Sequence, residues 1–221
     1  MKKKLLTLFL AGVIAFTGTN ALAGVSVDLF DNLASPPEAS QPDSTLSGST
    51  LLITFRGDDG ASRKIYYMEA DASLDFSDDT LTGDQVRTLD PLLVDETTPA
   101  YTEGLFPTIL PFTVSGVQKA GILFSGDGNL LFATIDLSSG AVESVTSVPT
   151  SLTGNINSLD ADIDSAGRVH AVLSMRNTDD EISYVSFEAS DPTNASTFFE
   201  SAAFAVSKQA ECGGNPPQVS V

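Results

Sequence analysis

Three aspartates at alternate positions, Asp160, Asp162 and Asp164, are the first residues in this sequence that could do chemistry. Carboxylate oxygens are the ligands that Ca²⁺ prefers, and the pattern D-x-D-x-D opens the EF-hand calcium loop. That loop needs Gly at its sixth position and Glu at its twelfth, but Ser165 and Ala171 stand there. The aspartates also alternate with apolar residues, which is typical of a strand with one buried face. Calcium is therefore a candidate cofactor, with these three aspartates as its candidate ligands.

His170 is the only histidine among the 221 residues. We therefore expect neither a metal site nor a catalytic triad that depends on histidine. A period of two places His170 on the same strand face as Val172, and we interpret it as a packed or surface side chain. A general acid–base role would require a carboxylate partner, which Asp160, Asp162 or Asp164 supplies only if the strands pair suitably.

The elements that position these residues lie between Ser158 and Ala189. Turn-forming residues at 164–167 and 176–181 divide this stretch into three short strands. Three consecutive antiparallel strands make a β-meander, which needs a second sheet to cover its apolar face.

Similar strand and turn patterns recur along the chain. Three strands rich in Ile, Leu, Tyr or Phe, at 65–70, 130–137 and 182–189, follow one another at roughly 50 to 65 residues, a period typical of propeller blades. We predict an all-β fold of antiparallel meanders that is β-propeller-like, with about three blades, and open or incomplete. The alternative is a β-sandwich, whose meanders have the same pattern.

The chain divides into three parts. Residues 1–23 have three lysines, an apolar run and an A-x-A cleavage site, and are predicted to be a secretory signal peptide. Residues 24–206 are predicted to form a single β-rich domain, with a loop or linker at 31–49 that is rich in Pro, Ser and Asp. Residues 207–221 are predicted to be a flexible tail. We expect export to the periplasm or the medium.

Charge and cysteine content exclude several classes of function. A net charge of −18 argues against binding to nucleic acid or anionic membranes, because both need cationic patches. No segment after the signal peptide is long and apolar enough to predict a membrane span. Cys212 is the only cysteine, so an intramolecular disulfide is impossible.

Two turns resemble the Asp box, the S-x-D-x-G-x-x-W hairpin of sialidase-like β-propellers. They are residues 125–132 (SGDGNLLF), with Asn129 and Phe132 in place of Gly and Trp, and residues 164–170 (DSAGRVH), which lack the leading Ser. The resemblance covers roughly residues 105–206. It implies a propeller built on structural turns, in which the Asp carboxylate accepts backbone N–H bonds.

The resemblance also implies a glycoside hydrolase site, with an arginine triad, a Tyr/Glu pair and an Asp. None of the five arginines after residue 23 stands in the Arg-Ile-Pro signature of the family, and the strand positions of the tyrosines suit packing. We therefore assign no catalytic residue, and we expect a binding protein rather than an enzyme.

The expected function is that of an exported binding or scaffold module of the bacterial cell envelope. It would present the turns at 56–62, 125–129 and 164–168 to a protein or glycan. One alternative is a fragment or remnant of a sialidase-like glycoside hydrolase. The other is a calcium-stabilised surface protein.

Overall fold

The computed structural model describes residues 38–58, 62–73, 92–94, 101, 103–152, 155–176, 181–201 and 204–205. Every regular element in these ranges is a β-strand, and none of them contains a helix long and apolar enough to cross a membrane. Residues 24–30, where Val25, Val27 and Leu29 alternate with other residues, are predicted to form a first strand. This strand, the predicted signal peptide and the predicted tail at 207–221 lie outside the described residues.

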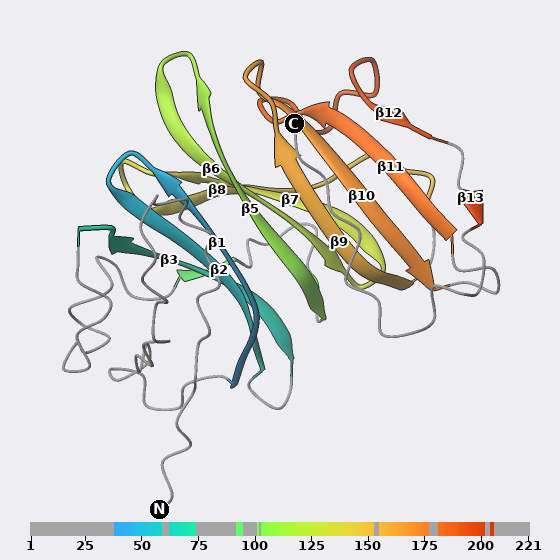
Figure 1. The fold of residues 1–221 in the computed structure, drawn as a ribbon, viewed down its shortest axis with the longest axis horizontal. Coiled ribbons are helices and arrows are strands. Elements are labelled where there is room, and N and C mark those ends of the chain that lie inside the picture. The colour runs from blue at the N-terminus through green and yellow to red at the C-terminus, as the bar shows by residue number, and fades with distance from the viewer. Residues whose placement is uncertain are drawn as a thin grey trace, which may run out of the picture.

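The strands form three antiparallel sheets (Figure 1). Sheet A contains β1 (Glu38–Ser47), β2 (Thr50–Asp58), β3 (Arg63–Asp71) and β4 (Leu92–Leu93). Sheet B contains β5 (Gly104–Val114), β6 (Val117–Gly126), β7 (Asn129–Asp136) and β8 (Ala141–Ser147). Sheet C contains β9 (Asn155–Ile163), β10 (Arg168–Arg176), β11 (Glu181–Glu188), β12 (Phe199–Glu200) and β13 (Phe204–Ala205).

This architecture confirms the predicted all-β fold of antiparallel meanders. The three sheets match the expected number of blades, and such open sheets fit a propeller-like or a sandwich arrangement. The three aromatic and aliphatic strands that repeat in the sequence become β3, β7 and β11, which are each the third strand of a sheet. The meander predicted between Ser158 and Ala189 is β9, β10 and β11.

Sheet B lies between the other two sheets, as Figure 1 shows, and buries both of its faces. In β7, Leu131, Ala133 and Ile135 pack toward sheet A. The alternate residues Leu130 and Phe132 pack toward sheet C. A strand that is covered on both faces takes a continuous apolar run instead of an alternating one, which explains the sequence LLFA at 130–133.

The predicted loop at 31–49 is wrong for residues 38–47, which form strand β1. The segment is polar and contains Pro42, so its sequence is typical of a loop. It becomes a strand because it pairs with β2 along its length, with a bulge between Ser40 and Asp43 that contains the proline. Proline is tolerated in a sheet at such a bulge or on an edge strand.

Polar side chains of β1 also join sheet A to the edge of sheet B. Gln41 Oε1 accepts the N–H of Phe106 at 2.9 Å, and Asp43 Oδ2 accepts the N–H of Ile109 at 2.8 Å. These two bonds satisfy backbone donors of β5 at an edge of its sheet. The polar residues that make the segment resemble a loop are therefore the residues that fix it in place.

Residues 197–206 have a sequence that predicts a last strand of the domain, but the strands in this segment are shorter. Only Phe199–Glu200 and Phe204–Ala205 are strands in the described part of this segment, and both pair with β11. Residues 191–198 form turns, with N–H to O=C bonds such as that from Thr197 to Asn194 at 3.1 Å.

We expect a neutral side chain at position 43 to stabilise the protein at pH 7. Burial raises the pKa of the Asp43 carboxyl, and repulsion from Asp160 adds to this, although N–H bonds from Ile109 and Ser44 oppose it. A group whose pKa is raised on folding contributes stability below its unfolded pKa and loses that contribution as pH rises through its folded pKa. Asp43→Asn keeps an oxygen acceptor for Ile109 but has no charge to bury.

The measurement is urea unfolding of the wild type and Asp43→Asn between pH 3 and pH 8. The variant should gain stability relative to the wild type as pH rises. The control is Asp191→Asn, at an exposed turn position. A stability difference that does not change with pH would contradict the prediction.

Candidate functional site on the outer face of sheet C

The face of sheet C that points away from sheet B carries polar and aromatic side chains. We call it the outer face. In β10, Val169, Ala171 and Leu173 pack into the core, so period two directs His170 and Val172 to the outer face. The strand pairing sets two rows of neighbours across it. One row runs Asp160, Val172, Tyr184, and the other runs Asp162, His170, Ser186, Phe199.

The turn between β9 and β10 is held together by Asp164. Its Oδ1 accepts the N–H groups of Ala166 and Arg168, both at 2.9 Å, and its carbonyl accepts the N–H of Gly167 at 2.9 Å. Gly167 has a φ of +84°, which is favourable for a residue without a Cβ atom. The Arg168 N–H and then the His170 side chain hold the pKa of the Asp164 carboxyl below its ordinary value. The turn predicted at 164–167 is thus confirmed.

His170 connects this turn to β11 through both ring nitrogens. Its Nε2 lies 3.2 Å from Asp164 Oδ2, and its Nδ1 lies 2.6 Å from the hydroxyl oxygen of Tyr184. In a neutral ring with its proton on Nε2, His170 donates to Asp164 and accepts from Tyr184. Of the three aspartates considered as a partner for this histidine, the structure therefore selects Asp164.

Aromatic rings continue this chain across the sheet. The Tyr184 ring lies 6.1 Å from the His170 ring and 6.0 Å from the Phe199 ring. Phe199 is 52% exposed, although it is a large apolar side chain in a strand. The outer face thus combines an exposed aromatic surface with a chain of hydrogen bonds that fixes one of its rings.

Arg168 extends over the end of β11 and is fully engaged there. Its guanidinium donates to Ser186 Oγ at 3.0 Å, to Thr197 O at 2.6 Å and to Glu188 Oε1 at 3.1 Å. These contacts attach the segment before β12 to the sheet, and so they support the position of Phe199. The positive charge of Arg168 is paired with the negative charge of the Glu188 carboxylate.

The three candidate calcium ligands do not converge. Asp160 and Asp162 lie on the outer face in different rows, and Asp162 Oδ1 accepts the N–H of Ile163 at 2.8 Å. Both oxygens of Asp164 are used by the turn and by His170. In the part of the chain that the structure describes, no group of three or more His, Cys, Asp or Glu side chains could hold a metal ion.

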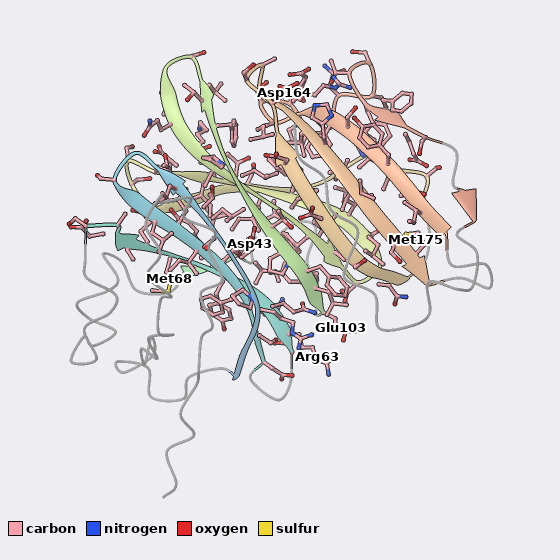
Figure 2. All side chains as sticks on the ribbon, in the orientation of Figure 1. Asp43, Arg63, Met68, Glu103, Asp164 and Met175 are labelled. Atoms are coloured by element: carbon pink, nitrogen blue, oxygen red, sulfur yellow. The ribbon has the colours of Figure 1, made fainter. Side chains whose placement is uncertain are left out.

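The three turns expected to contact a partner do not share one end of the molecule. Asp127, in the turn between β6 and β7, accepts the N–H of Glu103 at 2.9 Å, and Glu103 forms an ion pair with Arg63. Figure 2 shows Arg63 and Glu103 at the lower end of the sheets and Asp164 at the upper end. Residues 59–61 lie outside the described residues.

Sequence reasoning missed Tyr184 and Phe199 as surface residues. All four tyrosines were interpreted as packing residues, and this holds for Tyr67 and Tyr101, which are buried. Tyr184 differs because its neighbours Val185 and Ser183 face the core. The apolar pattern along 182–187 does not contain this signal, because Ile182 shares a face with Tyr184 whereas the polar Ser183 faces the core. Phe199 is placed beside Tyr184 by the pairing of β11 with β12.

Comparison with known proteins gives no family for this chain. No protein-family model matches it, and no curated protein matches its sequence.

Removing the Asp164 carboxylate should loosen the turn and free the His170 ring. We expect Asp164→Ala to speed the hydrogen exchange of the Ala166 and Arg168 amides, because both lose their acceptor. Asp164→Asn is the matched control, since its side-chain oxygen still accepts. The measurement is amide exchange by NMR, and equal exchange in the two variants would contradict the role of Asp164.

Proposed function

We propose that this protein is an exported binding module that contacts a protein or glycan partner through the outer face of sheet C. The observation that carries the proposal is the exposed Phe199 ring packed beside Tyr184. Binding hot spots are enriched in aromatic residues because each ring gains a large contact area for few frozen torsions.

The hydrogen-bond chain supports this role because it preorganises the face. Asp164 is fixed by its turn, His170 by Asp164, and the Tyr184 hydroxyl by His170. A ring that is already held in one orientation loses little entropy when a partner covers it. The polar groups around the rings supply the hydrogen-bonding rim that is typical of an interface.

The test is binding of the full chain to a glycan array and to envelope extract from the producing cell. Phe199→Ser should lower the binding of any retained partner at least about tenfold, as expected for a hot spot. Leu46→Ser is the matched control, because Leu46 is 48% exposed but lies on sheet A. No binding in either assay, or equal loss in both variants, would remove the basis for the proposal.

A second candidate, glycoside hydrolysis by a sialidase-like remnant, is favoured by one observation. His170 contacts both a carboxylate and a phenol, and such a histidine can transfer a proton when a substrate lies within reach. Hydrolysis of a fluorogenic glycoside by the wild type, lost in His170→Gln, would support it. The same slow rate in both proteins would exclude it.

A further inference from the structure

We infer that His170 is a pH switch of the outer face, which frees the Tyr184 hydroxyl as a hydrogen-bond donor when the neutral ring takes up a proton. This inference rests on the proposed binding function and adds its regulation. It comes from the way in which one imidazole ring connects a carboxylate of the turn between β9 and β10 to a phenol of β11.

In the neutral ring, the proton of the Tyr184 hydroxyl is used by His170. Tyr184 donates to Nδ1 at 2.6 Å, and Nε2 donates its own proton to Asp164 Oδ2 at 3.2 Å. The other tautomer would place an unprotonated Nε2 against the carboxylate, so that two acceptors would face each other. Among the described residues, the Tyr184 hydroxyl has no further partner. In this state it therefore offers no donor to a bound molecule.

A proton from water that binds to Nδ1 reverses the bond to Tyr184. Both ring nitrogens are then donors, so the Tyr184 oxygen accepts from Nδ1 and its own hydrogen turns away from the ring. The bond from Nε2 to Asp164 is kept, and it becomes an ion pair. The His170 side chain is 18% exposed, so solvent reaches it. Histidine is the side chain that changes its charge between about pH 5 and pH 8, which is the range of this switch.

Titratable and charged groups surround His170 on the turn and on both neighbouring strands. They are Asp160 and Asp162 of β9, Asp164 of the turn, Arg168 of β10, and Tyr184 and Glu188 of β11. On β12, Phe199 is uncharged and Glu200 bonds to Ser151 instead. Arg176 lies six residues farther along β10, which is roughly 20 Å. In this described set, His170 alone bonds to the Tyr184 hydroxyl, so its protonation controls that donor.

The freed hydroxyl belongs to the ring that lies beside the exposed Phe199. The two ring centroids are 6.0 Å apart. At acid pH the outer face therefore offers a hydrogen-bond donor next to an apolar contact, which fits a partner with a carbonyl or hydroxyl oxygen beside an apolar group. At pH 8 the same oxygen would lose its bonds to water without gaining this one. We expect binding to be about threefold to tenfold tighter at acid pH, the effect of one net hydrogen bond.

The first experiment follows the ring nitrogens of His170 by NMR in the full chain. His170 is the only histidine, so labelling of histidine with nitrogen-15 gives its signals alone. We expect an unprotonated Nδ1 and a protonated Nε2 at pH 8, and two protonated nitrogens at pH 5. Tyr184→Phe removes the hydroxyl but keeps the ring, so it should shift the Nδ1 signal at pH 8. A protonated Nδ1 at pH 8, or an unprotonated one at pH 5, would overturn the inference.

The second experiment measures binding of N-acetylphenylalanine amide, an uncharged probe with an aromatic ring and amide carbonyls. Titrations followed by the chemical shifts of the full chain should give about threefold to tenfold tighter binding at pH 5 than at pH 8. Tyr184→Phe should bind the probe equally at both pH values. His170→Gln is the matched control, because it keeps every carboxylate of the chain but cannot take up a proton at this position.

The outcomes separate this inference from the proposed function. Equal binding by the wild type at both pH values, or a pH dependence that persists in His170→Gln, would overturn the inference. The proposed function would stand in that case if Phe199→Ser still lost the probe. Absence of probe binding at both pH values would also overturn the inference, and the glycan array and envelope extract would then decide the proposed function separately. Tyr184→Phe keeps the test decisive if His170→Gln does not fold.

Discussion

Phe132→Ala should destabilise the protein by about 3–5 kcal/mol, the usual cost of removing a buried aromatic ring. The Phe132 ring is fully buried between sheets B and C. It meets Phe187 of β11 edge-on, with 5.3 Å between ring centroids, and lies 6.3 Å from Phe112. Its loss leaves a cavity at the junction of two sheets, and a domain has only about 5–15 kcal/mol of stability in total.

Urea unfolding provides the measurement, and Phe199→Ala provides the matched control. The control removes the same ring from an exposed position, so its effect on the free energy of unfolding should stay within about 1 kcal/mol. Similar losses in the two variants would mean that Phe132 does not join the sheets in solution.

Gly121 offers a second test of the same packing. A Cβ atom at Gly121 would lie 2.3 Å from Cζ of Phe132, so Gly121→Ala should destabilise the wild type. In the Phe132→Ala background the added methyl group has room, and its cost should shrink or change sign. A double-mutant cycle measures this coupling. Strict additivity would contradict the contact.

Tyr101→Phe should cause a loss of stability second only to that of Phe132→Ala, because the Tyr101 hydroxyl satisfies two buried backbone groups. It accepts the N–H of Ile65 at 3.1 Å and donates to the carbonyl of Val94. Each buried group left without a partner costs about 1–3 kcal/mol. The phenylalanine ring keeps the packing against Phe124, at 5.0 Å between centroids, so the variant isolates the hydroxyl.

Unfolding free energies and amide exchange test this prediction together. The Ile65 amide should exchange faster in Tyr101→Phe than in the wild type. The control is Tyr67→Phe, because the Tyr67 hydroxyl donates to the half-buried Glu69 side chain at 2.6 Å instead of to buried backbone. An equal or smaller loss of stability in Tyr101→Phe than in this control would contradict the prediction.

The resemblance to sialidase-like propellers stays a prediction. Asp164 accepts backbone N–H bonds within its turn, and Asp127 accepts the N–H of Glu103. Phe132, which stands where the Asp box has its tryptophan, lies in the core. These are structural roles, and they assign no activity to the chain.

The sequence by itself determined the features that depend on neighbouring residues. Period two identified the strands of the meander and the faces of the side chains on β9 and β10, as at Leu159 and His170. The residues Asp164 and Gly167 identified the turn, because its hydrogen bonds and its positive φ are local. In the same way, the first 23 residues predict export, and the acidic composition predicts the charge of a partner.

Only the tertiary structure decided which distant residues meet. Polar residues 38–47 became β1 because β2 and the edge of β5 supply partners for them. His170 meets Tyr184, and Tyr184 meets Phe199, because the register of β10, β11 and β12 places them side by side. Alternation assigns a residue to a face, but register is set by pairing between segments that are far apart in the chain. For this reason only the structure shows that Asp164 holds the turn, whereas Asp160 and Asp162 lie in different rows of the outer face.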